Sequence, residues 1–407
     1  MIVFDLSRLL ARARHPTPTG IDRVEHAYAR HLLAGTNDTC FVRATAWGGL
    51  ALLPRPLVAE FVGAVAALWG EGSSVRRRAR VRWTAARLRL GQLGRRRPRL
   101  AARLRAAPSR AVYLLASHRH LENRRLLSGL KRRHEAAFIC LVHDLIPIDF
   151  PEYARARQDR RHRRRIDAAA ALADAVIVPS AATGEALRRY VARGGRSLRV
   201  VTAPFGVEAP PVAAAGAGLP ARPYFVCLGT IEPRKNHLLL LNLWRELVGE
   251  GGDHAPALLL IGRRGWEIEN TIDMLDRCAA LNGTVSENRA LSDSETARVL
   301  KSARALLLPS FAEGFGFPLG EALALGTPVL ASDIPALREL GGAAPEYFAP
   351  LDGAAWRRAI LDYAADPSPR RQAQLDRLAT WRAPLWADHF AAVDALLADL
   401  ESGPGRR

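Results

Sequence analysis

Residues 308–329 read LPSFAEGFGFPLGEALALGTPV. The apolar residues before Pro309 predict the end of a buried strand, a glycine-rich loop follows, and Pro318 stands where the first turn of a helix accepts proline. Backbone N–H groups at such a helix start can bind phosphate. Glu313 in the loop and Glu321 about one turn into the helix can contact the two ends of one ligand, since carboxylates accept paired hydrogen bonds from vicinal hydroxyls. The stretch therefore indicates a strand, loop and helix that bind a phosphorylated, hydroxyl-rich ligand; two solvated acids on an ordinary turn are the alternative.

Short β-type runs alternate with helical stretches on both sides of this unit, which predicts an α/β chain with two doubly wound, Rossmann-like parallel sheets. The expected strands are Ile2–Asp5, Ala111–Leu115, Phe138–Val142, Ala175–Val178, Leu198–Thr202, Tyr224–Leu228, Ala257–Ile261, Ala305–Leu308 and Pro328–Ala331. Helices are expected at Asn236–Gly249 and Ser294–Ser302. Ligands of such sheets bind at the carboxyl ends of the strands, so a cleft between two domains is the expected site.

The domain boundaries follow from composition. Pro, Ala and Gly dominate residues 209–223, which predicts a linker between an N-terminal domain, 1–208, and a C-terminal domain, 224–368. Residues 369–407 are helical in pattern and form a C-terminal helical segment.

A second motif, GTIEPRKNH, directly follows an expected strand. Gly229 and Thr230 begin its loop, and Arg234 and Lys235 place two positive charges at the carboxyl end of the strand. Such a pair can neutralise a diphosphate as charge develops on it. Lys235 is one of only three lysines in an arginine-rich chain, which favours a specific role over a surface pair that caps a turn.

Two motifs of the N-terminal domain also offer polar groups beside strands. The motif CLVHDLIP ends a buried strand with His143 and Asp144, which can hydrogen-bond a sugar hydroxyl or hold a polar reaction centre. A structural histidine is the alternative. The motif TPTGIDRV, which contains Gly20 and Arg23, predicts a turn before an amphipathic helix, and a plain loop with a helix cap explains it equally well.

The spacing of Glu313 and Glu321 resembles the E-x7-E signature of retaining family 4 glycosyltransferases, the group 1 glycosyl transferases of the GT-B fold. The resemblance implies that Glu313 contacts the donor sugar and that Glu321 binds the ribose of the nucleotide. It also implies that the donor sugar and phosphates lie against the backbone of Gly314, Phe315, Gly316 and Phe317.

Other segments resemble the same family. The segments around Arg234 and Lys235 and around His143 are similar to its E-x-R-K-N and H-D-L motifs, which implies a diphosphate clamp and a histidine directed at the donor sugar. Gly262 and Arg263 follow a strand as a similar family segment does. The family's glycine-rich loop, which lies near the donor phosphates, falls at Gly20 and Arg23. The resemblance therefore implies a phosphate contact here, although this chain offers a single glycine, and Arg23 can supply what the missing glycine does not.

The resemblance implies a reaction: retaining transfer of a hexose from a nucleoside diphosphate sugar to a saccharide acceptor, in bacterial surface polysaccharide synthesis. GDP-mannose is a candidate donor. The donor is a substrate, so no cofactor is expected. The resemblance implies a metal-independent reaction, in which Arg234 and Lys235 act in place of an ion, and the absence of an Asp-x-Asp pair agrees with this. The alternatives are a nucleotide-sugar epimerase of similar architecture, or a basic lipid- or nucleic-acid-binding protein with a vestigial sugar site.

The net charge of +19 is local in origin, because residues 73–110 hold fourteen arginines and no acid. Val75, Val81, Trp83 and several leucines alternate with these arginines. A basic amphipathic helix with a tryptophan is typical of a segment attracted to anionic lipid, and a solvated basic face is the alternative. Nucleic acid is the least favoured partner because no recognised nucleic-acid motif accompanies the charge.

The expected cellular location follows from two features that the sequence lacks, a membrane-spanning apolar run and a secretory signal. No apolar run reaches the roughly 18 residues of a membrane span, and Met1–Asp5 lacks the basic start and long apolar centre of a secretory signal. We therefore expect a cytoplasmic protein that associates with the inner membrane only at its periphery, with a lipid-linked saccharide as a candidate acceptor. Its four cysteines form no C-x-x-C pair and indicate core residues rather than disulfides.

Overall fold

The computed structural model describes residues 1–45, 48–90, 100–195, 197–214 and 218–403. Residues 91–99 of the basic insertion 73–110 and residues 215–217 of the linker therefore lie outside the described residues. Contacts divide the chain into two compact units. The first unit holds Met1–Ile148, Arg157–Phe205 and the segment from Trp386 onward, and the second holds Asp149–Ala156 and Gly206–Leu385.

The first unit is built on a seven-stranded sheet in the order β3-β2-β1-β4-β5-β6-β7. All neighbours are parallel except β2 and β3, which form an antiparallel edge. The strands are β1 (Ile2–Asp5), β2 (Thr39–Ala44), β3 (Leu50–Leu53), β4 (Val112–Leu115), β5 (Ala137–Leu141), β6 (Ala175–Val178) and β7 (Val200–Thr202). The central strands are buried on both faces, as the apolar runs predict. Strands β2 and β3 were not expected, because β2 carries polar residues within a short run and β3 belongs to an edge hairpin.

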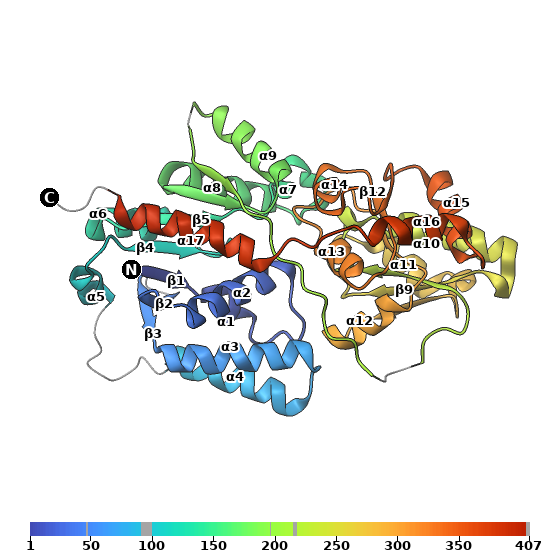
Figure 1. The fold of residues 1–407 in the computed structure, drawn as a ribbon, viewed down its shortest axis with the longest axis horizontal. Coiled ribbons are helices and arrows are strands. Elements are labelled where there is room, and N and C mark those ends of the chain that lie inside the picture. The colour runs from blue at the N-terminus through green and yellow to red at the C-terminus, as the bar shows by residue number, and fades with distance from the viewer. Residues whose placement is uncertain (46–47, 91–99, 196, 215–217, 404–407) are drawn as a thin grey trace. The chain divides into compact units, whose positions relative to one another are not determined.

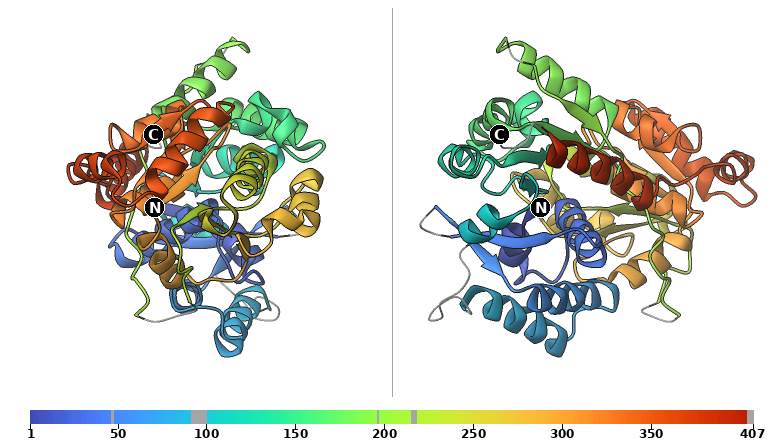
Figure 2. Two further views of the ribbon diagram at one scale, coloured as in Figure 1. Left: turned by 90° about the vertical axis from the view of Figure 1, so that its right-hand side faces the viewer. Right: turned by 60° about the vertical axis from the view of Figure 1, so that its left-hand side comes forward.

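Helices cover this sheet (Figure 1). They are α1 (Ser7–Arg12), α2 (Gly20–Ala34), α3 (Arg55–Gly70), α4 (Val75–Leu90), α5 (Leu100–Ala106), α6 (Arg124–His134), α7 (Ile146–Asp149), α8 (Gln158–Leu172), α9 (Ala181–Ala192) and α17 (Trp386–Ser402). Helices α3 and α4 lie side by side at the β3 end of the sheet (Figure 2). The basic insertion thus begins as a regular helix packed on an apolar one.

Helix α17 belongs to the first unit although it is the last element of the chain. Nδ1 of its His389 donates to the Ala203 carbonyl oxygen at 3.0 Å, and Nε2 of the same ring lies 2.8 Å from the Tyr28 hydroxyl. The Phe390 ring stacks on His31, with ring centroids 4.0 Å apart. The residues 369–407 that the sequence groups together are therefore divided between the units, with α16 (Pro369–Leu378) in the second. Long-range aromatic contacts make this division, and helical periodicity does not encode them.

The second unit is built on a six-stranded parallel sheet in the order β10-β9-β8-β11-β12-β13. Its strands are β8 (Tyr224–Leu228), β9 (Ala257–Ile261), β10 (Val285–Asn288), β11 (Ala305–Leu308), β12 (Val329–Ser332) and β13 (Glu346–Phe348). Three of the four expected strands match residue for residue. The outer strands β10 and β13 were not expected, because their half-exposed residues lack an apolar run.

Both faces of the second sheet carry helices and an apolar core. The helices are α10 (His237–Gly251), α11 (Glu269–Arg277), α12 (Asp293–Lys301), α13 (Phe317–Ala324), α14 (Pro335–Gly341), α15 (Gly353–Ala364) and α16. Trp244 and Trp356 are fully buried on one face, and Leu319 and Leu323 of α13 pack on the other. The fold is α/β with two doubly wound units, as predicted. None of the described helices combines the length and apolarity that crossing a bilayer requires.

Candidate active site

Sheet order explains how the two main motifs of the second unit meet. Strands β8 and β11 are hydrogen-bonded neighbours, with Ala305 opposite Phe225 and Leu306 opposite Val226. Parallel neighbours end at the same edge, so the loops after β8 and β11 leave the sheet together. The first loop carries Arg234 and Lys235 in a short 3₁₀ turn, and the second carries Glu313.

The side chains of these loops form a charged cluster of Arg234, Lys235 and Glu313. The Glu313 carboxylate accepts hydrogen bonds from Lys235 Nζ at 2.5 Å and from Arg234 Nη1 at 2.8 Å. The hydroxyl of Ser310 donates a third, at 2.8 Å. A fourth charge, the carboxylate of Glu232, lies 2.6 Å from Arg234 Nε. Each member of the cluster is therefore held in place before any ligand arrives.

The charges of this cluster change the titration of Glu313. Its side chain is 6% exposed, and burial alone would raise its pKa. The positive charges of Arg234 and Lys235 outweigh burial and lower the pKa to about 2. Glu313 is therefore ionised at neutral pH, and its two basic partners balance a charge that burial would otherwise penalise.

Two glycines let the loops of this site approach each other. A Cβ on Gly262 would lie 1.8 Å from the Gly229 carbonyl oxygen, so only glycine fits at position 262. Gly229 has φ +137 and faces Lys235, whose Nζ would lie 3.7 Å from a Cβ at position 229. The neighbouring Arg263 accepts a backbone hydrogen bond from Ile231 at 2.9 Å. The predicted segments at 229–230 and 262–263 thus form one packed loop pair beside the charged cluster.

Helix α13 begins directly after the loop that carries Glu313. Gly316 is its N-cap residue, with φ +100, and Pro318 lies in the first turn as predicted. The backbone N–H groups of Leu319 and Gly320 bond back to the Gly316 carbonyl. Glu321 follows in the second turn and is half-buried. Glu313 therefore lies in the loop before α13 and Glu321 about one turn into the helix, as their spacing predicts.

The His143–Asp144 motif lies in the first unit, within a cluster of three histidines. His143 is buried, and its Nε2 lies 2.9 Å from the Ala116 carbonyl oxygen. The ring of His118 lies 5.1 Å from that of His143 and 5.0 Å from that of His162. His162 Nε2 lies 3.0 Å from the Asp144 carbonyl oxygen. Because a carbonyl only accepts, Nε2 of His143 carries its proton and Nδ1 is left as an acceptor.

Burial keeps His143 and His118 of this cluster neutral. Desolvation lowers the pKa of His143 to about 4 and that of His118 well below its usual range, and the proximity of the rings adds to the effect. His143 can therefore accept a hydrogen bond from a hydroxyl at neutral pH, and it cannot supply a positive charge.

The remaining predicted residues, Gly20 and Arg23, lie in the first turn of α2, also in the first unit. Thr19 and Asp22 form a capping box there, and Asp22 accepts from Arg8 Nε at 2.8 Å. The local structure is thus a capped helix start, and a phosphate role for Gly20 and Arg23 remains a prediction. Across the residues that the structure describes, no group of three or more His, Cys, Asp or Glu side chains is arranged to hold a metal ion.

Comparisons with known proteins identify the family. Residues 222–366, which contain the whole charged cluster, match the model of glycosyl transferases group 1. The chain is also 30% identical over 252 residues to the lipopolysaccharide core biosynthesis mannosyltransferase LpcC of Rhizobium leguminosarum bv. viciae, covering 60% of this chain and 70% of the relative. The chain belongs to the group 1 glycosyl transferases.

This group 1 glycosyl transferase has further relatives. It is 30% identical over 233 residues to the serotype-specific mannosyltransferase WbdA of Escherichia coli, covering 53% of this chain and 28% of that protein. The chain thus spans less than a third of the length of this curated relative. The structure of Anabaena HepE in complex with UDP-glucose superposes with a TM-score of 0.63 and 13% identity, over 98% of this chain and 99% of the other. This likeness confirms the GT-B fold.

Several residues of the transferase's candidate site were missed in the sequence. Ser310 precedes Glu313 but belongs to no pattern of its own, and Glu232 begins the E-x-R-K-N motif without having been assigned a role. His118 carried a usable signal: Leu115 and Cys140 are paired in register on β4 and β5, and His118 and His143 each lie three residues further on. Two adjacent parallel strands that are followed by histidines at the same register bring those histidines together.

Proposed function

We propose that this chain is a retaining hexosyltransferase that transfers mannose from a nucleoside diphosphate donor, GDP-mannose, to a saccharide acceptor in bacterial surface polysaccharide synthesis. The observation that carries the proposal is the charged cluster. Two basic side chains of the loop after β8 bind the first glutamate of the E-x7-E motif, which lies in the loop after β11. The mannosyltransferase relatives support mannose as the sugar.

In this proposal, Arg234 and Lys235 bind the diphosphate of the donor. Departure of the nucleoside diphosphate places negative charge on the phosphate oxygens, and fixed cations stabilise that charge in the transition state. Glu232 and Glu313 hold the cations in position, so little reorganisation accompanies the reaction. Lys235 donates one of its three N–H groups to Glu313, which leaves donor capacity for a phosphate. No metal ion is needed for this step.

The sugar and nucleoside take the remaining groups. Glu313 and the backbone of residues 314–317 contact the sugar, Glu321 binds the ribose, and Gly229, Thr230, Gly262 and Arg263 line the phosphates. His143 accepts a hydrogen bond from a sugar hydroxyl through Nδ1, beside Asp144. Attack of the acceptor on the face that the phosphate leaves, with the phosphate taking the acceptor's proton, retains the configuration.

Two measurements test the proposal. Thermal unfolding in the presence of GDP, UDP and ADP identifies the base, because a nucleotide at 100 times its Kd adds about 2.7 kcal/mol to the free energy of unfolding. Incubation with GDP-mannose and a mannoside acceptor, followed by NMR of the product, then gives the anomeric configuration. An α-mannoside supports retention, and a β-mannoside contradicts it. Conversion of the free donor to an epimer without transfer would favour the epimerase alternative.

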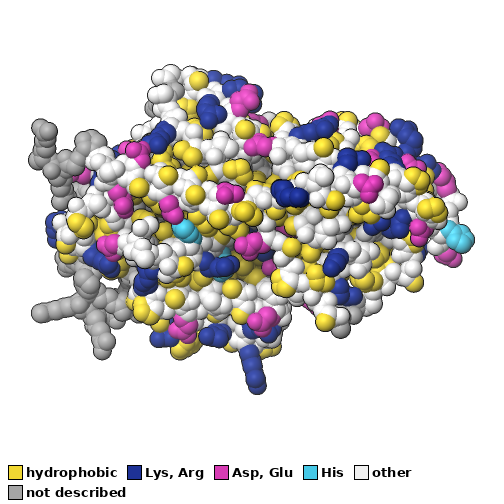
Figure 3. Space-filling model, viewed as in Figure 1, with side chains coloured by type: hydrophobic (Ala, Val, Ile, Leu, Met, Phe, Trp, Pro, Cys, Tyr) yellow, Lys and Arg dark blue, Asp and Glu magenta, His cyan; other side chains and the backbone are white. Residues whose placement is uncertain are grey.

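We also propose that α4 places the enzyme on the cytoplasmic face of an anionic membrane, where lipid-linked saccharide acceptors are found. Val75, Trp83 and Leu90 are 74%, 56% and 62% exposed. At 100° per residue, they project within about 80° of one another. Lys and Arg side chains lie along the lower edge in Figure 3, where α4 lies in Figure 1. An exposed apolar stripe flanked by arginines matches an anionic bilayer surface.

Vesicle sedimentation tests the membrane proposal. We expect binding to anionic vesicles, little binding to neutral ones, and partial release at about 0.5 M salt, because salt screens the arginines and leaves the apolar contact. Trp83→Ser should weaken binding, whereas Trp381→Ser, a tryptophan of the second unit, should not. Equal binding to neutral and anionic vesicles would reject the proposal.

A further inference from the structure

A cavity of about 470 Å³ lies beside α4 in the first unit. The described residues that line it are Ala13, Arg14, Arg82, Ala85, Ala86 and Arg89. Three of these six carry a guanidinium group, and none is an acid. The cavity is therefore distinct in residues and in unit from the charged cluster of Arg234, Lys235 and Glu313.

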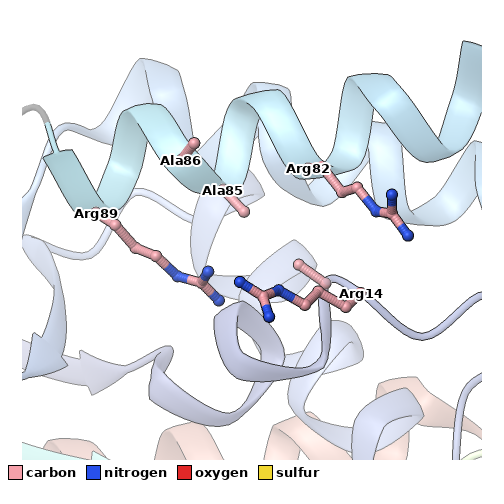
Figure 4. A pocket seen from close by; sticks show the side chains of 6 residues that line it. Arg14, Arg82, Ala85, Ala86 and Arg89 are labelled. Atoms are coloured by element: carbon pink, nitrogen blue, oxygen red, sulfur yellow. The ribbon is translucent and has the colours of Figure 1, made fainter.

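The spacing along α4 creates this cavity. Arg82 and Arg89 are seven residues apart and project within about 20° of each other on the helix. Between them, Ala85 and Ala86 present only methyl groups, which leave space where longer side chains would fill it. Arg14 approaches from the segment after α1, and Figure 4 shows its guanidinium facing that of Arg89.

The charges around the cavity are unbalanced. Neither Arg14 nor Arg82 forms an ion pair with any residue in the described part of the chain, although many surface arginines do. Arg89 is anchored by donating to the Leu10 carbonyl, and its own carbonyl accepts from Arg43 Nη2 at 3.1 Å. Burial and the nearby positive charges, that of Arg14 foremost, lower the pKa of Arg89. Figure 4 shows the guanidinium of Arg82 pointing away from those of Arg14 and Arg89, and the two like charges that face each other across an open space favour an anion between them.

We propose that this cavity binds a diphosphate group, which makes it a second anion site that goes beyond the proposed donor site. Guanidinium groups match phosphate oxygens bidentately, and three of them balance the two to three negative charges of a diphosphate or its ester. The volume is within the range of pockets that hold an organic ligand, so the phosphates can carry a larger substituent. The diphosphate can belong to a lipid headgroup or to a soluble ester, and the chemistry that recognises it is the same.

Isothermal titration with inorganic pyrophosphate at low salt tests the site. The Arg14→Gln/Arg82→Gln variant removes two guanidiniums that make no ion pair with described residues. The Arg76→Gln/Arg80→Gln variant is the matched control, because it removes the same charge from exposed positions of the same helix. We expect the pocket variant to lose one pyrophosphate site or to weaken it at least tenfold, and the control to keep it. The donor site is intact in both variants and does not affect the comparison.

A second variant tests whether binding needs the volume of the cavity as well as the charge of its arginines. Ala86→Phe fills the cavity without changing any charge, and it should weaken the same pyrophosphate site while thermal unfolding shows that the protein is folded. Equal pyrophosphate affinity and stoichiometry in wild type, pocket variant and control would overturn the proposal, as would equal losses in the pocket variant and the control.

Vesicles then assign the source of the diphosphate. If the pocket variant loses more binding than the control to vesicles that contain a polyprenyl diphosphate, the ligand is a lipid headgroup. If the two variants bind those vesicles equally while only the pocket variant loses pyrophosphate, the ligand is a soluble ester. The proposed transferase activity is measured in neither arm, so its failure is distinguishable from failure of this site.

Discussion

The charged cluster of the second unit and the histidine cluster of the first are built in the same way and have opposite electrostatics. Each collects side chains that follow the carboxyl ends of two adjacent parallel strands, β8 with β11 and β4 with β5, and His162 of α8 completes the histidine cluster. In the first pair, burial is offset by opposite charges, and Glu313 stays ionised. In the second, burial acts on like groups, and His143 stays neutral. The carboxyl ends of adjacent strands in two doubly wound sheets thus supply fixed charge in one case and a neutral hydrogen-bond acceptor in the other.

The largest effect should come from removing the carboxylate of the charged cluster. Glu313→Gln keeps the shape but leaves Arg234 and Lys235 without their shared partner, and breaking a buried ion pair costs about 3–5 kcal/mol of unfolding free energy. Urea denaturation at pH 7 measures it. Glu185→Gln is the control, because Glu185 pairs with Arg189 on the surface and should cost less than about 1 kcal/mol.

The difference in unfolding free energy between wild type and Glu313→Gln should depend on pH, because the pKa of Glu313 is lowered in the folded state. Glu313 has a folded-state pKa of about 2 against an ordinary 4.5, so its contribution is complete above about pH 4.5 and is lost as the pH falls towards 2. The difference between wild type and Glu313→Gln should therefore be constant from pH 7 to 5 and narrow below 4.5. A constant difference down to pH 3 would mean that the carboxylate is not held by these cations.

Removing either cation should act mainly on turnover. Lys235→Ala and Arg234→Ala should each lower kcat by about 10²-fold or more, because fixed charge at the leaving phosphate acts in the transition state. Release of nucleoside diphosphate from the donor measures kcat. The controls are Lys301→Ala and Arg245→Ala, which make the same changes at exposed positions. Wild-type kcat in both cluster variants would remove the diphosphate role.

The histidine cluster should give a smaller and pH-independent effect. His143→Ala removes one neutral hydrogen bond to the sugar and should lower kcat about tenfold. Because the pKa of His143 is lowered to about 4, the wild-type rate should show no inflection from this residue between pH 5.5 and 8. His254→Ala, at an exposed histidine, serves as the control. An inflection near pH 6.5 that His143→Gln abolishes would show that His143 gains a charge near neutral pH. The histidine cluster would then be charged, as the Glu313 cluster is, and the contrast between the two would fail.

The smallest effect should separate the two ends of the E-x7-E motif. Glu321→Ala should weaken binding of the nucleoside alone by a few-fold to about tenfold, since it removes hydrogen bonds to the ribose. Glu313→Gln should leave nucleoside affinity unchanged, because its contacts are with the cations and the sugar. Titration calorimetry with the nucleoside of the preferred base distinguishes them. Equal losses in both variants would contradict the division of roles between the two acids.

Much of the fold was predictable because each central strand is buried on both faces and appears in the sequence as a short apolar run. Tyr224–Leu228, Ala257–Ile261 and Ala305–Leu308 match the structure to the residue for this reason. The edge strand β13 is half-exposed and carries no such run, and β3 is an apolar run of only four residues, too short for periodicity to assign to a strand. The motifs that follow strands were predictable too, since the rule that ligands bind at the carboxyl ends of parallel strands depends only on local order.

The sequence by itself therefore determined that the chain forms two doubly wound units and which loops carry chemistry, because alternation and turn residues act over a few positions. Only the tertiary structure decided that Lys235 binds Glu313, 78 residues away, because that contact depends on β8 lying next to β11. The same holds for α17, which joins the first unit through Tyr28, and for Arg14, which meets Arg89 across a cavity. These contacts depend on which strands and helices become neighbours. Crossover connections decide which strands are adjacent, and they do so only in the fully assembled sheet.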